Sequence, residues 1–250
     1  PQGMDAQVVD VTSAYAVLCV HGPRARDLLQ PLCAQDLSNA AFPFGSWQQL
    51  NVAGAPLRAL RVTYVGELGW ELHVPVEFAQ GLYDALVAAG GAVGLVDAGY
   101  RAIESLRLEK GYRAWARELT ASTSPLEAGL GWAVKLAGDA DFLGRMALLK
   151  QRAEGLTRRL VGVTVDDDSA VLWGRETILR DGQPVGWLTS AGYGHSIGKG
   201  VGLGYVSCAA GVHKDWLRGG QWRLEVARRE VEMDVHLRPV FDPKMLRVKA

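Results

Sequence analysis

The hydrophobic pattern of the chain changes near residue 155. Before that point some stretches alternate apolar and polar residues, as strands do, and others repeat apolar residues every three to four positions, as helices do. The strand-like stretches are 7–12, 16–21, 47–52, 57–64, 70–75 and 132–136, and the helical ones are 22–33, 76–89, 97–110 and 144–154. Helices that follow pairs of strands predict an α+β arrangement, a mixed sheet with helices on one face.

After residue 155, short alternating runs replace the helical spacing. The runs are 160–165, 176–179, 185–190, 199–206, 222–226 and 232–237. Asp181-Gly182 falls between the second and third runs and is a typical hairpin turn. We therefore predict two domains: residues 1–155, of α+β type, and residues 156–250, an all-β barrel-like domain of about six strands.

The turn between the strands 57–64 and 70–75 contains two glycines. Gly66 and Gly69 are expected to supply the positive φ angles that a tight connection requires. In the second strand the apolar residues at 70, 72 and 74 share one face, and Glu71 and His73 share the other. Glu71 is therefore expected to point away from the core.

Tyr64 and Glu71 stand at the two shoulders of this hairpin. A carboxylate accepts two parallel hydrogen bonds, so Glu71 suits a planar heterocycle with two adjacent N–H donors. The residues alone also allow a purely structural hairpin, stabilised by cross-strand pairs.

The helix 97–110, for which Asp97 is a plausible N-cap, carries charges three residues apart. Arg101, Glu104 and Arg107 can form ion pairs on the helix surface at this spacing. Alternatively, Arg107, which stands between two leucines, turns inward and orients a buried carboxylate. The sequence leaves both alternatives open.

Composition narrows the classes of function. The chain has 250 residues and zero formal net charge, with 27 basic and 27 acidic residues, which gives no electrostatic footprint for nucleic acid or a membrane surface. No run of about 18 apolar residues could cross a bilayer. Three cysteines without a C-x-x-C pair and five scattered histidines argue against a disulfide framework or a metal site, and favour the reducing cytoplasm.

The glycine-rich stretch 192–200 differs from a phosphate-binding loop. Gly200 follows Lys199 where serine or threonine is required, and the stretch lies between expected strands. We expect a structural loop whose small residues let another layer approach. No dinucleotide-binding motif and no nucleophile elbow occurs in the sequence.

Several stretches together resemble one family, that of the glycine cleavage system T-protein. In chain order they are 21–25 (G-P-x-A), 62–71 (Y-x-G-E-x-G-x-E), 105–111 (S-L-R-L-E-x-G), 124–130 (P-L-E-x-x-L) and 141–145 (F-x-G-[RK]). Within the family, residues 99–105, 109–115 and 238–243 are similar to the folate-binding portion of dimethylglycine and sarcosine dehydrogenases or oxidases.

The resemblance implies a tetrahydrofolate site. By it, Tyr64 and Glu71 hold the pterin end of the folate, and Glu71 pairs with its 2-amino and N3–H groups. Trp115 falls where the T-protein has an aromatic residue near the folate, and we include Arg107 in the expected cofactor-binding set. Ile103 stands where the T-protein has a folate-contacting arginine, a departure that favours the dehydrogenase branch.

The resemblance also has a gap. Full-length members of the family begin with a further segment, which carries the aspartate thought to assist attack by the folate amine, and we find nothing like it in this sequence. The expectation is a partial folate-binding domain without an identified catalytic residue. Such a chain is a subunit completed by another chain, a fragment, or a degenerate paralogue.

The expected activity is folate-dependent transfer of an aminomethyl or methylene group to tetrahydrofolate. An amine is oxidised elsewhere to an iminium, with FAD in a partner domain or chain, and tetrahydrofolate takes up the carbon as 5,10-methylene-tetrahydrofolate. Two alternatives remain: a non-catalytic folate-binding or assembly module, and a folate-dependent demethylase. The sequence does not identify the one-carbon donor.

Overall fold

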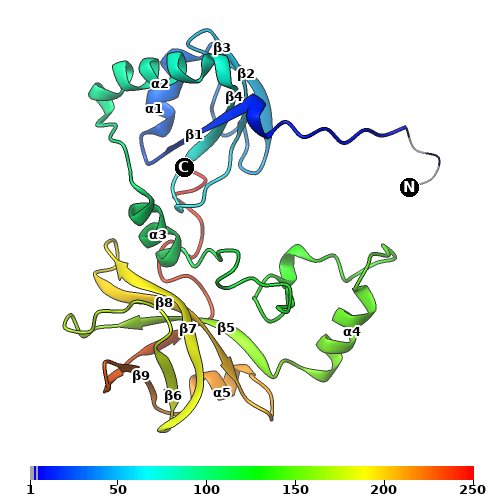
Figure 1. Ribbon diagram of the computed structural model, residues 1–250, viewed down its shortest axis with the longest axis vertical. Helices are drawn as coiled ribbons and strands as arrows, with labels where there is room; N and C mark the ends of the chain where they lie inside the picture. The colour runs from blue at the N-terminus through cyan, green and yellow to red at the C-terminus, as the bar shows by residue number, and fades with distance from the viewer. Residues whose placement is uncertain (1–2, 4) are drawn as a thin grey trace. The chain divides into compact units, whose positions relative to one another are not determined.

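The computed structural model describes residue 3 and residues 5–250, and the chain forms two compact units (Figure 1). The first unit runs from the N-terminus through Ala98 and includes Lys244–Ala250, and the second is Gly99–Pro243. The chain therefore passes from one unit to the other twice. The two units are defined by which residues lie close together in space. The predicted domain boundary at residue 155 rests on the hydrophobic pattern of the sequence, and it stays a prediction.

A four-stranded sheet forms the centre of the first unit. Its strands, in the order β1-β4-β3-β2, are β1 (Tyr15–His21), β4 (Gly69–Pro75), β3 (Ala55–Leu60) and β2 (Trp47–Val52). Each pair of neighbours is antiparallel, so the expected mixed sheet is an antiparallel one. Strand β2 has the predicted bounds, while β3 ends at Leu60, before the predicted Tyr64.

Two helices cover one face of this sheet, as predicted (Figure 1). They are α1 (Ala25–Leu29) and α2 (Val76–Gly90). Helix α1 is shorter than the predicted 22–33, because Pro31 has no N–H to donate and the chain continues as a 3₁₀ turn, Gln30–Leu32. Leucines of both helices pack on the inward side chains of the sheet. The fully buried side chains at this contact include Leu29 and Leu82 from the helices and Trp70 and Leu72 from β4.

The predicted strand 7–12 is absent from the structure. This segment is largely irregular and leads into a 3₁₀ turn, Thr12–Ala14. Its valines are solvent-exposed, with Val8 at 101% and Val9 at 69% relative exposure. Alternation alone was misleading here, because no neighbouring strand pairs with the segment and no layer covers it.

The C-terminal residues return to the first unit. Val248 is buried there, and the carbonyl of Ala250 accepts hydrogen bonds from two arginines. Arg26 Nη2 donates to it at 2.9 Å and Arg61 Nη2 at 3.2 Å. Residues 244–250 thus complete a structure whose other parts lie at the start of the chain.

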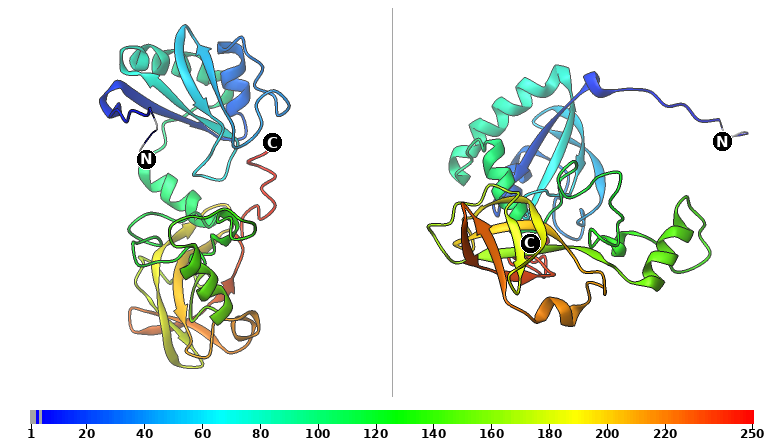
Figure 2. Two further views of the ribbon diagram at one scale, coloured as in Figure 1. Left: turned by 90° about the vertical axis from the view of Figure 1, so that its right-hand side faces the viewer. Right: turned by 60° about the horizontal axis from the view of Figure 1, so that its bottom comes forward.

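The second unit contains the remaining helices and a seven-stranded antiparallel sheet, which curls strongly (Figure 2). The helices are α3 (Tyr100–Glu109), α4 (Arg145–Glu154) and α5 (Lys214–Arg218). The strands, in the order β10-β9-β6-β7-β8-β5-β11, are β10 (Arg229–Glu232), β9 (Trp222–Val226), β6 (Thr177–Arg180), β7 (Gln183–Gly194), β8 (Lys199–Ser207), β5 (Arg158–Val165) and β11 (Asp234–His236). The predicted α+β fold with a barrel-like C-terminal part is confirmed.

Local predictions in the second unit meet different outcomes. Asp181 and Gly182 have φ of 53° and 74° and join β6 to β7, as the hairpin motif predicts. The predicted strand 132–136 is instead a 3₁₀ turn, Gly131–Ala133, followed by irregular chain. Helix α5 was not expected, since it spans a single short turn that shows no helical period.

The start of α3 also differs from the prediction. Gly99, not Asp97, is its N-cap residue, and no side chain caps the helix. Asp97 belongs to the first unit and accepts a hydrogen bond from the Tyr83 hydroxyl at 2.8 Å. Its side chain is therefore engaged with the preceding helix rather than with α3.

Strand β7 lies so close to two glycines of β8 that side chains at these positions would collide with it. A Cβ at Gly204 would lie 2.5 Å from the carbonyl oxygen of Trp187 on β7, and one at Gly202 would lie 2.9 Å from the Leu188 side chain. The approaching element is thus the neighbouring strand. The expected approach of another layer is therefore an approach of the adjacent strand within the same sheet.

Candidate functional site

Strand β4 presents Glu71 on the face of the sheet that the helices leave uncovered. Trp70, Leu72 and Val74 have 0% exposure and pack toward the helices, as their alternation predicts. The side chains of Glu71 and His73 are 30% and 31% exposed on the opposite face. Glu71 Oε2 lies 3.5 Å from His73 Nε2, within the distance of an ion pair. The contact is not a hydrogen bond, and His73 Nε2 has no other hydrogen-bond partner.

The charge of Glu71 affects the pKa values of two side chains on β1. Cys19 stands directly opposite Glu71 in the β1–β4 register, and His21 follows on the same face. Burial raises the pKa of the Cys19 thiol, and the Glu71 carboxylate raises it further. Burial lowers the pKa of His21, while its hydrogen bond to Val62 O and the Glu71 charge act in the opposite direction. The Glu71 charge therefore contributes to the pKa of both groups, after the larger effect of burial.

Tyr64 lies in the loop between β3 and β4, not at the end of a strand. Its exposure is 37%, so part of the phenol ring is accessible to a ligand. The Thr63 hydroxyl accepts the backbone N–H groups of residues 65 and 66, each at 3.1 Å, and thereby fixes the turn. Gly66 has φ of 76°, as predicted.

Gly69 has a different role from the one predicted. It belongs to β4 and does not adopt a positive φ. A Cβ there would lie 2.2 Å from His21 Cδ2 and 2.3 Å from the Val20 carbonyl oxygen. The glycine therefore lets β1 approach the end of the hairpin.

A groove of about 630 Å³ lies on the same sheet face. Its walls are the segment 9–12, part of β1, and the side chains of Arg58, Leu60 and His73. Leu60 is the cross-strand partner of Glu71, so the groove is adjacent to the carboxylate. Its volume lies in the range of small-molecule sites.

In the second unit, the last turns of α3 dock on the β7–β8 hairpin through three polar side chains. Ser105 Oγ donates to a β7 carbonyl at 2.7 Å, and Arg107 Nη2 donates to Ser190 Oγ at 2.7 Å. Glu109 Oε1 accepts the backbone N–H of Ser196 at 2.6 Å. The S-L-R-L-E stretch thus fastens helix to sheet.

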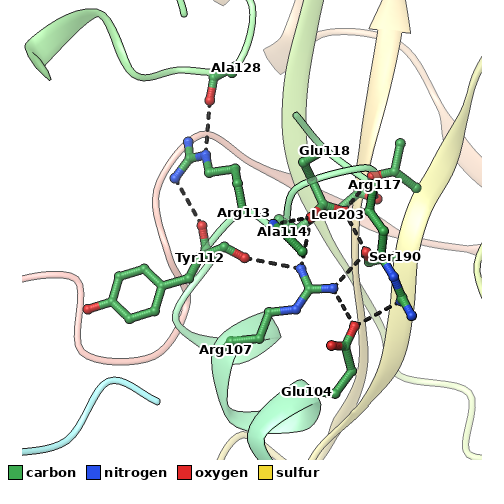
Figure 3. A network of polar contacts seen from close by, with 12 residues as sticks. Glu104, Arg107, Tyr112, Arg113, Ala114, Arg117, Glu118, Ala128, Ser190 and Leu203 are labelled. Carbon is green, nitrogen blue, oxygen red and sulfur yellow. Dashed lines mark hydrogen bonds and ion pairs between the residues drawn. The ribbon is translucent and has the colours of Figure 1, made fainter. Parts of the chain in front are cut away.

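Arg107 turns inward, the second of the two alternatives that the sequence left open (Figure 3). Its side chain has 0% exposure, and its Nη1 donates to Glu118 Oε2 at 3.0 Å and to the Tyr112 carbonyl at 3.1 Å. Nη2 also pairs with Glu104, one turn earlier in the helix. Both terminal nitrogens are committed to protein partners, so Arg107 orients Glu118 and has no terminal nitrogen left for a ligand.

Trp115 lies in the loop 114–119, which follows α3, and pairs with Leu119 in an isolated β-bridge across the turn 116–118. The Ala116 amide donates to the Leu119 carbonyl at 2.8 Å, and the Leu119 amide donates back to Ala114 O at 3.2 Å. Trp115 itself is 74% exposed, so its indole offers an open stacking surface.

The predicted site residues divide between the two units. Tyr64 and Glu71 belong to one hairpin of the first unit, and Arg107 and Trp115 belong to the second. Within the second unit, Glu118 connects Arg107 to the loop that carries Trp115.

Sequence reasoning missed three buried charged residues of the second unit. They are Glu109, Lys110 and Glu118, with exposures of 1%, 2% and 0%. Lys110 Nζ pairs with Asp242 Oδ2 at 2.8 Å, and Glu118 binds side chains about seventy positions further along the chain. No local pattern signals such distant partners, although the adjacent charges Glu109 and Lys110 at the end of α3 are a weak hint.

The described residues offer neither a membrane-spanning helix nor a cluster of metal-ligating side chains. No described helix has both the length and the apolar character needed to cross a membrane. In the same part of the chain, no group of three or more histidine, cysteine, aspartate or glutamate side chains is placed to hold a metal ion.

These features define an α+β domain joined to an antiparallel barrel-like domain, with a carboxylate on an open sheet face. The chain belongs to the glycine cleavage T-protein family. The family profile described as "GCVT N-terminal domain" matches residues 1–138, and "Glycine cleavage T-protein C-terminal barrel domain" matches residues 158–242. The resemblance inferred from the motifs is confirmed.

Relatives within the family are longer proteins. Mitochondrial sarcosine dehydrogenase of Mus musculus is 45% identical over 250 residues, which are 99% of this chain and 27% of that protein. Mitochondrial dimethylglycine dehydrogenase of Mus musculus is 44% identical over 204 residues, 82% of this chain and 24% of that protein. The chain thus spans about a quarter of the length of these two relatives.

Aminomethyltransferases are also similar to this chain. The enzyme of Halothermothrix orenii is 36% identical over 200 residues, 80% of this chain and 55% of that protein. The crystal structure of the glycine cleavage system aminomethyltransferase T from Bartonella henselae superposes with a TM-score of 0.73 at 27% identity. That match covers 90% of this chain and 59% of the other.

Proposed function

We propose that this chain supplies the folate-binding part of a one-carbon transfer unit whose acceptor is tetrahydrofolate. The observation that carries the proposal is the position of Glu71, a half-buried carboxylate on an uncovered sheet face beside a groove of about 630 Å³. Its two oxygens match the adjacent N–H donors of a pterin ring, and the groove has the volume of a small-molecule site.

The other residues take distinct roles in this proposal. Tyr64, with its ring partly exposed in the loop beside β4, contacts the pterin. Trp115, whose indole is exposed in the second unit, is the aromatic residue that the family resemblance assigns to the folate. Arg107 acts indirectly, because its terminal nitrogens are occupied by Glu118 and other protein groups. The contribution of these residues is binding, orientation and exclusion of water from the acceptor.

The donor side of the reaction lies outside the described site. Tetrahydrofolate would take up the carbon of an iminium that an FAD-dependent partner domain or chain forms by oxidising an N-methyl or aminomethyl amine. No residue of this chain is assigned as a catalytic base. The names of the relatives, sarcosine and dimethylglycine dehydrogenase and aminomethyltransferase, support this class of donor.

Titration calorimetry with tetrahydrofolate tests the binding role of Glu71. Glu71→Ala should weaken binding by about 2 kcal/mol or more, roughly thirtyfold, because charged hydrogen bonds to a buried ligand are lost. Glu77→Ala is the matched control, since Glu77 is exposed on α2 and lies on the helical side of the sheet. Unchanged affinity in Glu71→Ala would remove Glu71 from the site.

A turnover assay separates transfer from binding alone. The chain is incubated with tetrahydrofolate and a formaldehyde or aminomethyl donor, and the folate product is identified. Methylene-folate formed without a partner supports a transferase. Binding without turnover supports a non-catalytic folate-binding or assembly module, and methyl-folate supports a folate-dependent demethylase.

The compartment stays a prediction. The cytoplasm was expected from the use of cysteine, and the three cysteines are free thiols in the structure. The sarcosine and dimethylglycine dehydrogenases of Mus musculus are mitochondrial by name. Fractionation of cells that express the natural protein would decide between the two compartments.

A further inference from the structure

Glu118 is the buried residue of the loop that presents Trp115. The loop residues 115–117 are exposed, whereas Glu118 has 0% exposure. The loop also contains a non-glycine residue in the left-handed region, Ala116 with φ of 64°. Such a conformation persists only where the surrounding structure enforces it.

The carboxylate of Glu118 is saturated by donors from three parts of the second unit (Figure 3). Oε2 accepts Arg107 Nη1 at 3.0 Å and the Ala114 amide at 2.8 Å. Oε1 accepts Ser190 Oγ at 2.5 Å and Thr189 Oγ1 at 2.7 Å. Four donors fill the acceptor capacity of a carboxylate.

The backbone of Glu118 is held as firmly as its side chain. Its amide donates to the Ala114 carbonyl at 3.1 Å, and its carbonyl accepts the Tyr205 hydroxyl at 2.9 Å. One residue therefore ties the start of the loop, the end of α3 and the strands β7 and β8 together. The backbone of Trp115 pairs with Leu119 in an isolated β-bridge that closes the turn 116–118, and its exposed indole projects from this bridge.

We propose that Glu118 is a positioning residue for folate binding: it fixes the conformation of the loop 114–119 and thereby the direction of the Trp115 indole. This inference rests on the proposed function, in which Trp115 contacts the folate. Glu118 itself is fully buried and does not touch the ligand. Its effect on affinity must therefore pass through Trp115.

A double-mutant cycle on the full chain tests this route. The dissociation constant for tetrahydrofolate is measured by calorimetry for the unaltered chain, Glu118→Gln, Trp115→Ala and the double variant. We expect each single change to weaken binding roughly tenfold and the double variant to be no weaker than Trp115→Ala, because contacts that act through one group are not additive. Losses that add in the double variant would overturn the positioning role.

Glu127→Gln is the control for general damage to the second unit. Glu127 is another largely buried carboxylate of this unit, paired with Arg158 at 3.2 Å, and it lies outside the loop. The Glu127→Gln variant should bind tetrahydrofolate with an affinity within about twofold of that of the unaltered chain. If Glu127→Gln weakens binding as much as Glu118→Gln, the specific role of Glu118 is refuted.

A second variant keeps the test valid if Glu118→Gln does not fold. Ser190→Ala removes one donor from Glu118 and leaves the Arg107–Glu118 ion pair in place. It should weaken tetrahydrofolate binding by a smaller factor, and that factor should vanish in the Trp115→Ala background. A factor that persists there would contradict the proposal.

Hydrogen exchange distinguishes failure of this inference from failure of the proposed function. The amides of Ala116 and Leu119, which close the loop, should exchange faster in Ser190→Ala and in Glu118→Gln whether or not folate binds. Unchanged exchange would overturn the anchoring role of Glu118. Absence of tetrahydrofolate binding by the unaltered chain would overturn the proposed function and the folate part of this inference, while leaving the exchange result readable.

Discussion

Cys19 and Glu71 stand directly opposite each other on strands β1 and β4, on the face of the sheet that the helices do not cover. The carboxylate raises the pKa of the thiol in addition to the effect of burial. Cys19 is accessible to solvent, although partial burial raises the pKa of its thiol, so its rate of alkylation reports on the place where we propose that the pterin binds.

Removing the charge of Glu71 should make Cys19 more reactive. In Glu71→Gln the pKa of the thiol falls, the thiolate fraction at mildly alkaline pH rises, and alkylation by iodoacetamide speeds up by roughly a few-fold. Peptide mass spectrometry measures the rate, with Cys208 in the second unit as the internal reference. The same substitution should lower the pKa of His21 further, as an NMR titration would show. An unchanged Cys19 rate would mean that Glu71 does not act on this face.

The two arginines that contact Glu104 should differ widely in their contribution to stability. Arg107→Leu leaves Glu118 buried without its cation and should cost about 3–5 kcal/mol. Arg117→Leu removes a half-exposed arginine from the same Glu104 and should cost about 0–1 kcal/mol. Urea unfolding of both variants measures the difference, and equal costs would show that burial of the Arg107–Glu118 pair is not decisive.

Tyr205 should make the second unit sensitive to alkali. Burial raises the pKa of Tyr205 to about 12, and its hydroxyl donates to the Glu118 carbonyl. The folded chain holds the phenol proton more tightly than the unfolded chain, whose pKa is about 10. This contribution to stability is therefore complete below about pH 10 and is lost as the pH rises toward 12.

Denaturant unfolding of the wild type and Tyr205→Phe, at about pH 9 and about pH 11, checks this sign. Phenylalanine cannot ionise, so the variant should lose less stability between the two pH values than the wild type does. Burial also raises the pKa of Tyr112, but that residue is present in both chains and cancels from the comparison. Parallel losses would argue against a buried Tyr205.

Two glycines of the first unit should respond in opposite directions to replacement by alanine. In Gly69→Ala the new methyl group would meet His21 Cδ2 at 2.2 Å and the Val20 carbonyl oxygen at 2.3 Å, and the β1–β4 pairing must open. We expect a loss of roughly 2–4 kcal/mol, as for overpacking that moves backbone. Gly81 lies within α2 with nothing near its Cβ position, so Gly81→Ala should stabilise by about 0.5–1 kcal/mol. Thermal unfolding of the two variants gives both signs, and a neutral Gly69→Ala would refute the close approach.

Alternation predicted the side of the sheet on which Glu71 lies, because the two-residue repeat of a strand is a local property. It failed for the segment 7–12, where the same alternation occurs but no strand pairs with it. Glycine was correctly expected in the hairpin, yet only the structure shows that Gly66 serves the turn and Gly69 serves packing against β1. Local patterns identify such residues more reliably than they identify the reason for them.

The buried polar network could not be predicted in the same way. Arg107 meets Ser190, which is 83 positions away, and Glu118 lies in a stretch without regular secondary structure. Both alternatives for Arg107 were compatible with its spacing, since an inward-facing arginine requires an acceptor that the local sequence does not reveal. Tyr64 and Glu71 were selected by resemblance to a family, and their role in binding stays a proposal.

The return of residues 244–250 to the first unit bears on the order of synthesis. The second unit is an insertion between two parts of the first, so its own residues are all translated before the first unit has its last segment. The partners of Ala250, Arg26 and Arg61, are translated before the second unit, and their hydrogen bonds to Ala250 can form only after it. Within these 250 residues the first unit is thus begun before the second and gains its segment 244–250 after it. A chain that ends at Pro243 should therefore show a destabilised first unit beside a second unit that keeps all of its residues.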